Sequence, residues 1–265
     1  MTLRTAGRVA WIHVAPVKGM ALVALDTADL TATGIEVDRR FCVLDPAGRI
    51  QNGKVAGPLV RIAPDYDAGA GTLALRFPDG TVVRASVDVG EPVLATFSGR
   101  PRDARLVRGP WAEAVSDWAG RPFRIARFDG HGRGVDRGAD GGATTLVSTA
   151  ALATMADWAG VDRPLDGRRF RMTFGIDGLV AFAEEGWLGR TVRVGSALVR
   201  PLGNVGRCAV TTQDPDRGVP TLDTLRLLAD HRRDVLTTEA LPFGVWAEVL
   251  EPGRVALGET VGPAE

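Results

Sequence analysis

Residues 71–87 read GTLALRFPDGTVVRASV, and this stretch carries the clearest fold signal in the chain. Two apolar-rich runs are joined at Pro78-Asp79-Gly80, residues that favour a tight reversal, so the stretch predicts a β-hairpin. Short runs separated by turn residues also occur at 8–19, 39–50 and 91–107. Many short strands at close spacing indicate a mainly β or α+β fold built around a barrel or a sandwich.

A few stretches depart from this β pattern because their apolar residues recur at helical spacing. Residues 111–120 form one such stretch, and Gly120 is expected to end the helix. A second helix is expected to begin at 148–149 and to end at Gly160, and a third is expected within 221–235. The prediction is therefore a β-rich protein with a few peripheral helices.

Residues 129–143 are rich in glycine and almost free of apolar side chains. This composition predicts a linker or a mobile loop, with a lid that closes over an anion as the alternative. We therefore expect one β domain over 1–128 and a second domain over 144–265. Within the second, residues 179–212 are expected to alternate short strands and glycine turns, and Cys208 is expected to begin a further β-like run.

The composition is that of a globular protein with balanced charge. Among 265 residues, 32 basic side chains match 32 acidic ones, and 45% of the residues are hydrophobic. Net charge therefore gives no argument for a nucleic-acid or membrane partner. Because the sequence shows no membrane-length apolar run, no secretory signal pattern and only two cysteines, we expect a reducing, cytoplasmic setting.

Common catalytic patterns are missing from the sequence. The three histidines lie far apart at positions 13, 131 and 231, and none has the spacing of a zinc site. No nucleophile elbow or P-loop occurs, and the glycine clusters do not form a dinucleotide fingerprint.

The two cysteines occupy contrasting contexts. Cys42 lies in the middle of an apolar strand, which favours a role as a core residue. Cys208 follows Arg207 and a glycine-containing segment, and a neighbouring guanidinium favours a thiolate. A thiolate suits either a nucleophile or a ligand to a soft metal, while a structural role for Cys208 stays open at this point.

Several blocks occur in the order found in MOSC proteins. These are HVAPVKGM, GIEVDRRFCVLDPAGRI, RFRMTFGIDGLVAFAEEGW, GRCAVTTQDPDRG and LPFGVWAEVLEPGRVALGETV. The first two resemble the MOSC N-terminal β-barrel domain and the others resemble the MOSC domain. The chain therefore resembles proteins built like the mitochondrial amidoxime-reducing components and their bacterial counterparts.

The resemblance implies a two-domain, β-rich protein that holds the molybdenum cofactor, molybdopterin, between its domains. Cys208 matches the family cysteine that ligates molybdenum, which makes it the expected metal ligand and catalytic residue. Basic and hydroxyl side chains that match family blocks are the expected cofactor contacts. They are Lys18, Arg39, Arg40, Lys54, Ser148, Thr149, Arg171, Thr173 and Arg207.

The activity implied by the resemblance is reduction of N-hydroxylated or N-oxide compounds. Electrons would come from a separate ferredoxin- or flavin-type donor, because the sequence ends soon after the MOSC-like blocks. Alternatives are a metal-free enzyme or sulfur carrier that uses Cys208 as nucleophile in a biosynthetic pathway, and a non-catalytic cofactor carrier. Gly19, Thr173 and Gly206 depart from the residues usual at these family positions.

Overall fold

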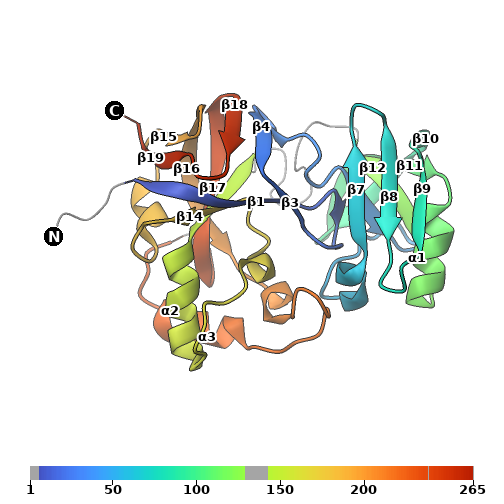
Figure 1. Cartoon of the computed structure of the whole chain (residues 1–265). Helices are drawn as coiled ribbons and strands as arrows, with labels where there is room; N and C mark the ends of the chain where they lie inside the picture. Colours follow the sequence, from blue (N-terminus) through green and yellow to red (C-terminus); the bar gives the residue numbers. More distant parts are fainter. Residues whose placement is uncertain (1–5, 129–142, 238, 265) are drawn as a thin grey trace.

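The structure is a computed structural model that describes residues 6–128, 143–237 and 239–264. Two β-rich lobes lie side by side (Figure 1). Three α-helices occur in the described part of the chain, and strands make up most of its regular structure. The prediction of a mainly β fold is confirmed.

The first lobe is a closed barrel of seven strands. The strands run in the order β14-β13-β17-β16-β15-β19-β1, and pairing of β14 with β1 closes the ring. All neighbours are antiparallel except β13 and β14. The strand bounds are β1 (Gly7–Val14), β13 (Thr144–Ser148), β14 (Phe174–Asp177), β15 (Val192–Val194), β16 (Ala197–Gly206), β17 (Pro242–Glu251) and β19 (Thr260–Pro263).

Short strands extend the barrel. β3 (Val23–Leu25) pairs with β1. A separate sheet joins β18 (Gly253–Ala256), β4 (Thr27–Thr31) and β5 (Gly34–Ile35). Strands from the start of the chain are thus paired with strands from its end. The predicted boundary at 129–143 lies outside the described residues except for Ala143, and it stays a prediction.

The second lobe contains two sheets and one helix. The larger sheet has the order β10-β11-β12-β6-β2, and the smaller has the order β7-β8-β9. The hairpin predicted for 71–87 is confirmed, because β8 and β9 pair across the expected turn. The bounds are β2 (Val17–Lys18), β6 (Phe41–Leu44), β7 (Ala63–Asp67), β8 (Thr72–Arg76), β9 (Val82–Ser86), β10 (Asp88–Phe97), β11 (Arg100–Arg108), β12 (Arg124–Phe128) and α1 (Trp111–Ala119).

The helices match their predictions. α1 ends at Gly120, which has a left-handed backbone, and its Trp111 side chain is buried in the core of the second lobe. α2 (Thr149–Ala159) and α3 (Thr224–His231) lie beside the barrel and share one apolar cluster (Figure 1). α2 ends at Gly160, also left-handed, as expected.

Two segments expected to be strands are short 3₁₀ helices instead. Ala183–Trp187 forms one and Ala209–Thr212 the other. The prediction of a β-like run beginning at Cys208 is therefore wrong. The backbone N–H of Thr211 and its hydroxyl both donate to the Cys208 carbonyl, at 3.0 and 3.1 Å, and this local competition replaces strand pairing.

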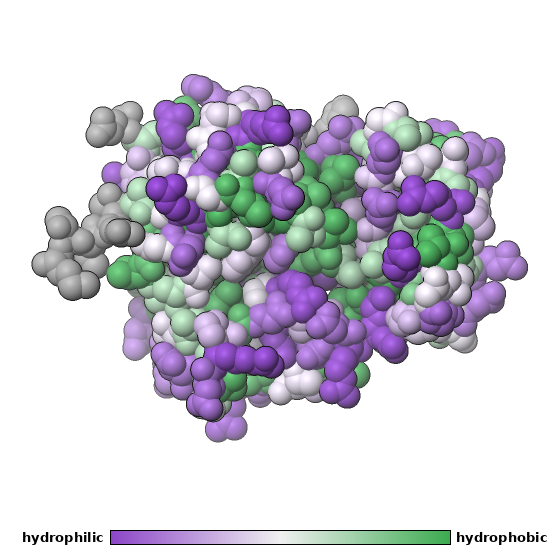
Figure 2. Space-filling model, in the orientation of Figure 1, coloured by the Kyte–Doolittle hydropathy of each residue, from purple (hydrophilic) through white to green (hydrophobic). Residues whose placement is uncertain are grey.

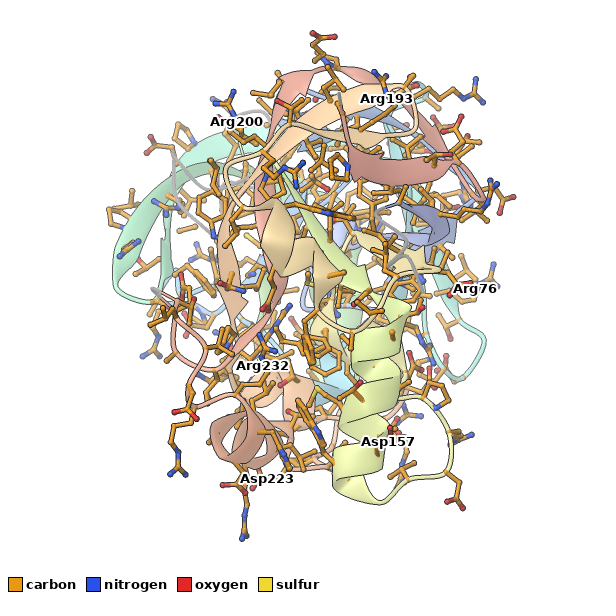
Figure 3. The ribbon with its side chains drawn as sticks, turned by 90° about the vertical axis from the view of Figure 1, so that its left-hand side faces the viewer. Arg76, Asp157, Arg193, Arg200, Asp223 and Arg232 are labelled. Carbon is orange, nitrogen blue, oxygen red and sulfur yellow. The ribbon has the colours of Figure 1, made fainter. Side chains whose placement is uncertain are left out.

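A largely buried ion pair links α3 to the segment after β14 in the barrel lobe. The Arg232 guanidinium lies 2.5 Å from a Glu185 carboxylate oxygen, and it also donates to the Pro242 carbonyl. Its cation sits 3.9 Å from the Phe182 ring centroid. Arg232 lies among the packed side chains near α3, whereas Arg193 and Arg200 extend from the barrel strands (Figure 3).

Cys42 is fully buried, as predicted for a core residue. Burial raises the pKa of the Cys42 thiol well above its ordinary value, although the nearby Lys18 opposes this shift. Within the described residues, no helix combines the length and the apolar character needed to cross a membrane.

The packing at the barrel seam gives a stability prediction. A Cβ at Gly175 would lie 2.2 Å from Trp11, so Gly175→Ala must displace the indole and should cost about 1–3 kcal/mol. Gly186→Ala is the matched control, because a Cβ there would meet nothing within 4 Å. Urea denaturation of both variants measures the difference. Equal stability of Gly175→Ala and the parent would show that this packing is wrong.

The buried carboxyl of Glu184 gives a pH prediction. Burial raises its pKa from 4.5 to about 7, and the nearby Ser148 hydroxyl offsets only part of the shift. The folded state therefore binds an extra proton between these pH values. The contribution of this proton to the free energy of unfolding is fully present below pH 4.5. It is lost as the pH rises through 7.

Glu184→Gln stays neutral at every pH, so its stability relative to the parent should rise with pH. The gain between pH 5 and pH 8 should be about 2–3 kcal/mol in urea denaturation. Glu113→Gln, at an exposed position on α1, is the control and should show no such gain. A pH-independent difference between Glu184→Gln and the parent would contradict the assignment.

Candidate functional site

A cleft of about 360 Å³ lies between the two lobes. The second lobe contributes the end of β2, the loop at 52–54 and the hairpin tip at 97–98. The barrel lobe contributes Thr145 and the segments 168–172 and 205–215. Hydrophilic side chains gather over the lower part of the junction between the lobes (Figure 2).

The cleft lining is strongly basic. Asp214 is the one carboxylate among the lining residues, all of which belong to the described part of the chain. The basic lining residues are Lys18, Arg39, Lys54, Arg168, Arg169, Arg171 and Arg207. Because the whole chain has balanced charge, this excess of cations is a local feature that favours an anionic ligand.

Cys208 lies in the cleft wall two residues after the end of β16, and its side chain is exposed. Its backbone is extended and is held by Thr211, whose hydroxyl also lies 2.7 Å from the hydroxyl of Thr224 on α3. The thiol is thus presented to the cleft from a fixed backbone. It is well placed to act as a ligand or a nucleophile.

Arg207 lines the cleft, but its guanidinium also bonds to the protein. It donates to the carbonyls of Phe170 and Phe243, each at 3.0 Å, and to the Met172 sulfur at 2.7 Å. Its cation also lies 5.6 Å and 5.8 Å from the two phenylalanine ring centroids. Arg207 therefore anchors the segment that leads into Cys208.

Arg39 and Arg171 form a chain of contacts at the lobe junction. Arg39 donates to both oxygens of Asp38 at 2.6 Å and to the Arg171 carbonyl at 3.0 Å. Arg171 in turn donates to the Met20 carbonyl at 2.9 Å. Both arginines have left-handed backbones, with φ of 55° and 52°. Such a conformation costs about 1–3 kcal/mol per residue and is typical of functional sites.

Arg168 and Arg169 were not predicted from the sequence, although both line the cleft. Arg168 bonds to Asp166 and Asp216, and these carboxylates raise the pKa of its guanidinium. Arg169 donates to the Gln213 carbonyl at 2.6 Å, and burial lowers the pKa of its guanidinium. The sequence signal was the run Arg-Arg-Phe-Arg at 168–171, of which only the last arginine matched a family block.

The two lysines of the chain both line the cleft. Lys18 ends β2, is largely buried, and places its ammonium 4.5 Å from the Phe97 ring centroid. Lys54 is exposed on the loop at 52–54. Phe97 and Ser98 were missed by sequence reasoning because a hairpin tip brings them to the cleft from a distant part of the chain.

Four predicted contact residues do not line the cleft. Of the neighbouring arginines Arg39 and Arg40, Arg39 lines the cleft and Arg40 does not. The Ser148 hydroxyl accepts from the Phe182 backbone inside the barrel lobe, and the Thr149 hydroxyl donates to Asp177. The Thr173 hydroxyl lies 3.2 Å from that of Thr145, which does line the cleft, so Thr173 supports the wall from behind.

The two glycines that depart from the family pattern lie in different surroundings. Gly19 has φ of +89°, a backbone that other residues rarely adopt. A Cβ at Gly206 would lie 2.5 Å from a Glu239 carboxylate oxygen. The backbone conformation therefore explains Gly19, whereas a side chain at position 206 would first require the Glu239 carboxylate to move.

Comparison with known proteins assigns the chain to a family. Residues 6–118 match the MOSC N-terminal β-barrel domain and residues 134–262 match the MOSC domain. Mitochondrial amidoxime-reducing component 1 of Xenopus laevis is 24% identical, with 98% of this chain and 82% of that protein covered. Its human counterpart is 23% identical, with 98% and 83% covered. The chain belongs to the MOSC-domain proteins that carry a MOSC N-terminal β-barrel domain.

Proposed function

We propose that this protein is a molybdenum cofactor-dependent oxidoreductase that reduces N-hydroxylated or N-oxide compounds. The observation that carries the proposal is the exposed Cys208 thiol in a basic cleft between two lobes. MOSC membership and the amidoxime-reducing relatives support this class of reaction.

The donor set of the cleft fits a molybdopterin-type cofactor. A thiolate is a soft ligand suited to a metal that already has sulfur ligands. Among the described residues, no group of three or more histidine, cysteine or acidic side chains is placed to hold a metal ion. A metal at Cys208 therefore needs other ligands, and a dithiolene cofactor brings its own. When bound, the cofactor supplies the two-electron redox chemistry.

The basic residues would hold the charged and polar ends of that cofactor. Arginine forks match phosphate and pterin oxygens, and lysine adds a compact positive charge. We assign cofactor contact to Lys18, Arg39, Lys54 and Arg171, which line the cleft. Arg207 is a positioning residue for Cys208, because its guanidinium fixes the preceding backbone.

The reaction removes one oxygen atom from nitrogen. An N–OH group becomes N–H, water leaves, and two electrons and two protons are consumed. We propose that electrons arrive from a separate donor protein.

Replacing the proposed ligand should abolish turnover but keep the fold. Cys208→Ala, produced in a host that makes molybdenum cofactor, should reduce benzamidoxime at least about 100-fold more slowly than the parent. Dithionite-reduced methyl viologen serves as donor, and elemental analysis should show loss of molybdenum. Cys42→Ala is the control and should keep its molybdenum. Parental rates in Cys208→Ala would refute the ligand assignment.

Replacing a proposed phosphate or pterin contact should weaken cofactor retention. Arg171→Gln should retain about one tenth of the parental pterin after gel filtration, because one charge-assisted contact is lost. Pterin fluorescence after oxidative release measures this, and thermal unfolding reports on the fold. Arg200→Gln, at a surface position outside the cleft (Figure 3), should retain the parental amount. Equal retention in both variants would remove Arg171 from the site.

A further inference from the structure

Two loops meet beside the cleft, residues 53–58 of the second lobe and residues 213–220 of the barrel lobe. A Cβ at Gly57 would lie 2.1 Å from the Gly218 carbonyl oxygen, so the two backbones are in direct contact. The Gln213 amide donates to the Gly53 carbonyl at 2.5 Å in the same region. Gln213 also pairs with Pro220 in a β-bridge. The loops therefore form one continuous surface across the seam between the lobes.

This surface presents apolar side chains to solvent. Val55 is 59% exposed and Val219 is 40% exposed, and Pro58 and Pro220 are also exposed. All four lie within three residues of the Gly57–Gly218 contact. We call these four residues the seam patch. Exposed apolar residues gathered in this way are typical of interaction sites.

Basic side chains surround the seam patch. Exposed cations lie next to it in the sequence at Lys54, Arg61 and Arg217. Arg121 comes from after α1, and its guanidinium donates to the Val55 carbonyl at 3.2 Å. The neighbouring acid Asp216 is already paired with Arg168 at 2.7 Å. An apolar centre with a basic rim is complementary to a partner with an apolar centre and an acidic rim.

The loop that carries Val55 also borders the site. A Cβ at Gly53 would lie 3.6 Å from Val210, which lines the cleft two residues beyond Cys208. A protein docked on the patch would therefore approach the thiol side of the cleft. Weak electron-transfer encounters use small interfaces, which agrees with a patch of a few residues.

We propose that the seam patch is the docking surface for a small acidic electron-transfer protein that carries an iron–sulfur cluster or a flavin. This proposal rests on the reductase function proposed above. The patch residues bind the donor and take no part in binding the cofactor.

A variant that reverses the character of the patch tests the proposal. Val55→Asp, Val219→Asp and Arg217→Glu are combined, and none of these residues lines the cleft. The control combines Val82→Asp on β9 with Arg193→Glu on β15, at exposed positions outside the seam patch and the cleft lining. Benzamidoxime reduction is driven either by a reduced plant-type ferredoxin or flavodoxin, or by methyl viologen.

The patch variant should lose about tenfold in kcat/KM with the protein donor that supports turnover. Its rate with methyl viologen should stay within about twofold of the parent, and the control variant should match the parent with both. High salt should slow the parent only with the protein donor, because the contact is between exposed charges. Equal losses with both donors, or no loss with the protein donor, would overturn the proposal.

A binding measurement separates this proposal from the reductase function. If the loaded parent does not turn over with methyl viologen, the reductase proposal fails, and docking is judged by surface plasmon resonance alone. Binding of ferredoxin or flavodoxin to the parent at low salt, weakened about tenfold in the patch variant, would support docking. Absence of binding to both probes would overturn it. Sedimentation showing a parental dimer that the patch variant loses would also overturn it, because a second copy would then occupy the patch.

Discussion

The buried pair of Asp38 and Arg39 fixes the place where the chain crosses between the lobes. Asp38 accepts the backbone N–H of Ala15 at 2.8 Å, and the Arg39 backbone donates to the Ala15 carbonyl. Arg39 also reaches the Arg171 carbonyl in the barrel lobe. Removing one partner of such a pair leaves a buried charge at a cost of about 3–5 kcal/mol. The chain crosses between the lobes at 15–16, between β1 and β2, and at 36–40, between β5 and β6. Both crossing segments, and hence the floor of the cleft, depend on this pair.

Local signals predicted the elements well but could not reveal every contact. The hairpin at 71–87 and the glycine ends of α1 and α2 follow from residues adjacent in sequence. Ser148 does not line the cleft, because strand alternation decides where a side chain points. It lies two residues after Leu146 on β13, so it shares the barrel interior with that core residue.

The site shows the same division between local and tertiary information. Lys18, Arg171 and Cys208 matched family blocks, and the structure brings all three into one cleft lining. Arg169 and Phe97 reach that lining through the packing of one lobe against the other, which a single sequence does not show. The packing of the lobes depends on the crossing segments, and the place of Phe97 depends also on the register of β10 and β11.

The two cysteines show how one residue type can serve opposite purposes in one chain. Cys42 is enclosed by apolar neighbours, and burial keeps its thiol protonated. Cys208 is exposed, and its backbone is held by Thr211 while Arg207 anchors the residue before it. Cations gathered around an exposed thiol favour the binding of an anion in the cleft. An anion that binds there would stabilise the folded protein by mass action. The basic side chains and the exposed thiol belong to one cleft lining, so a single ligand can meet both.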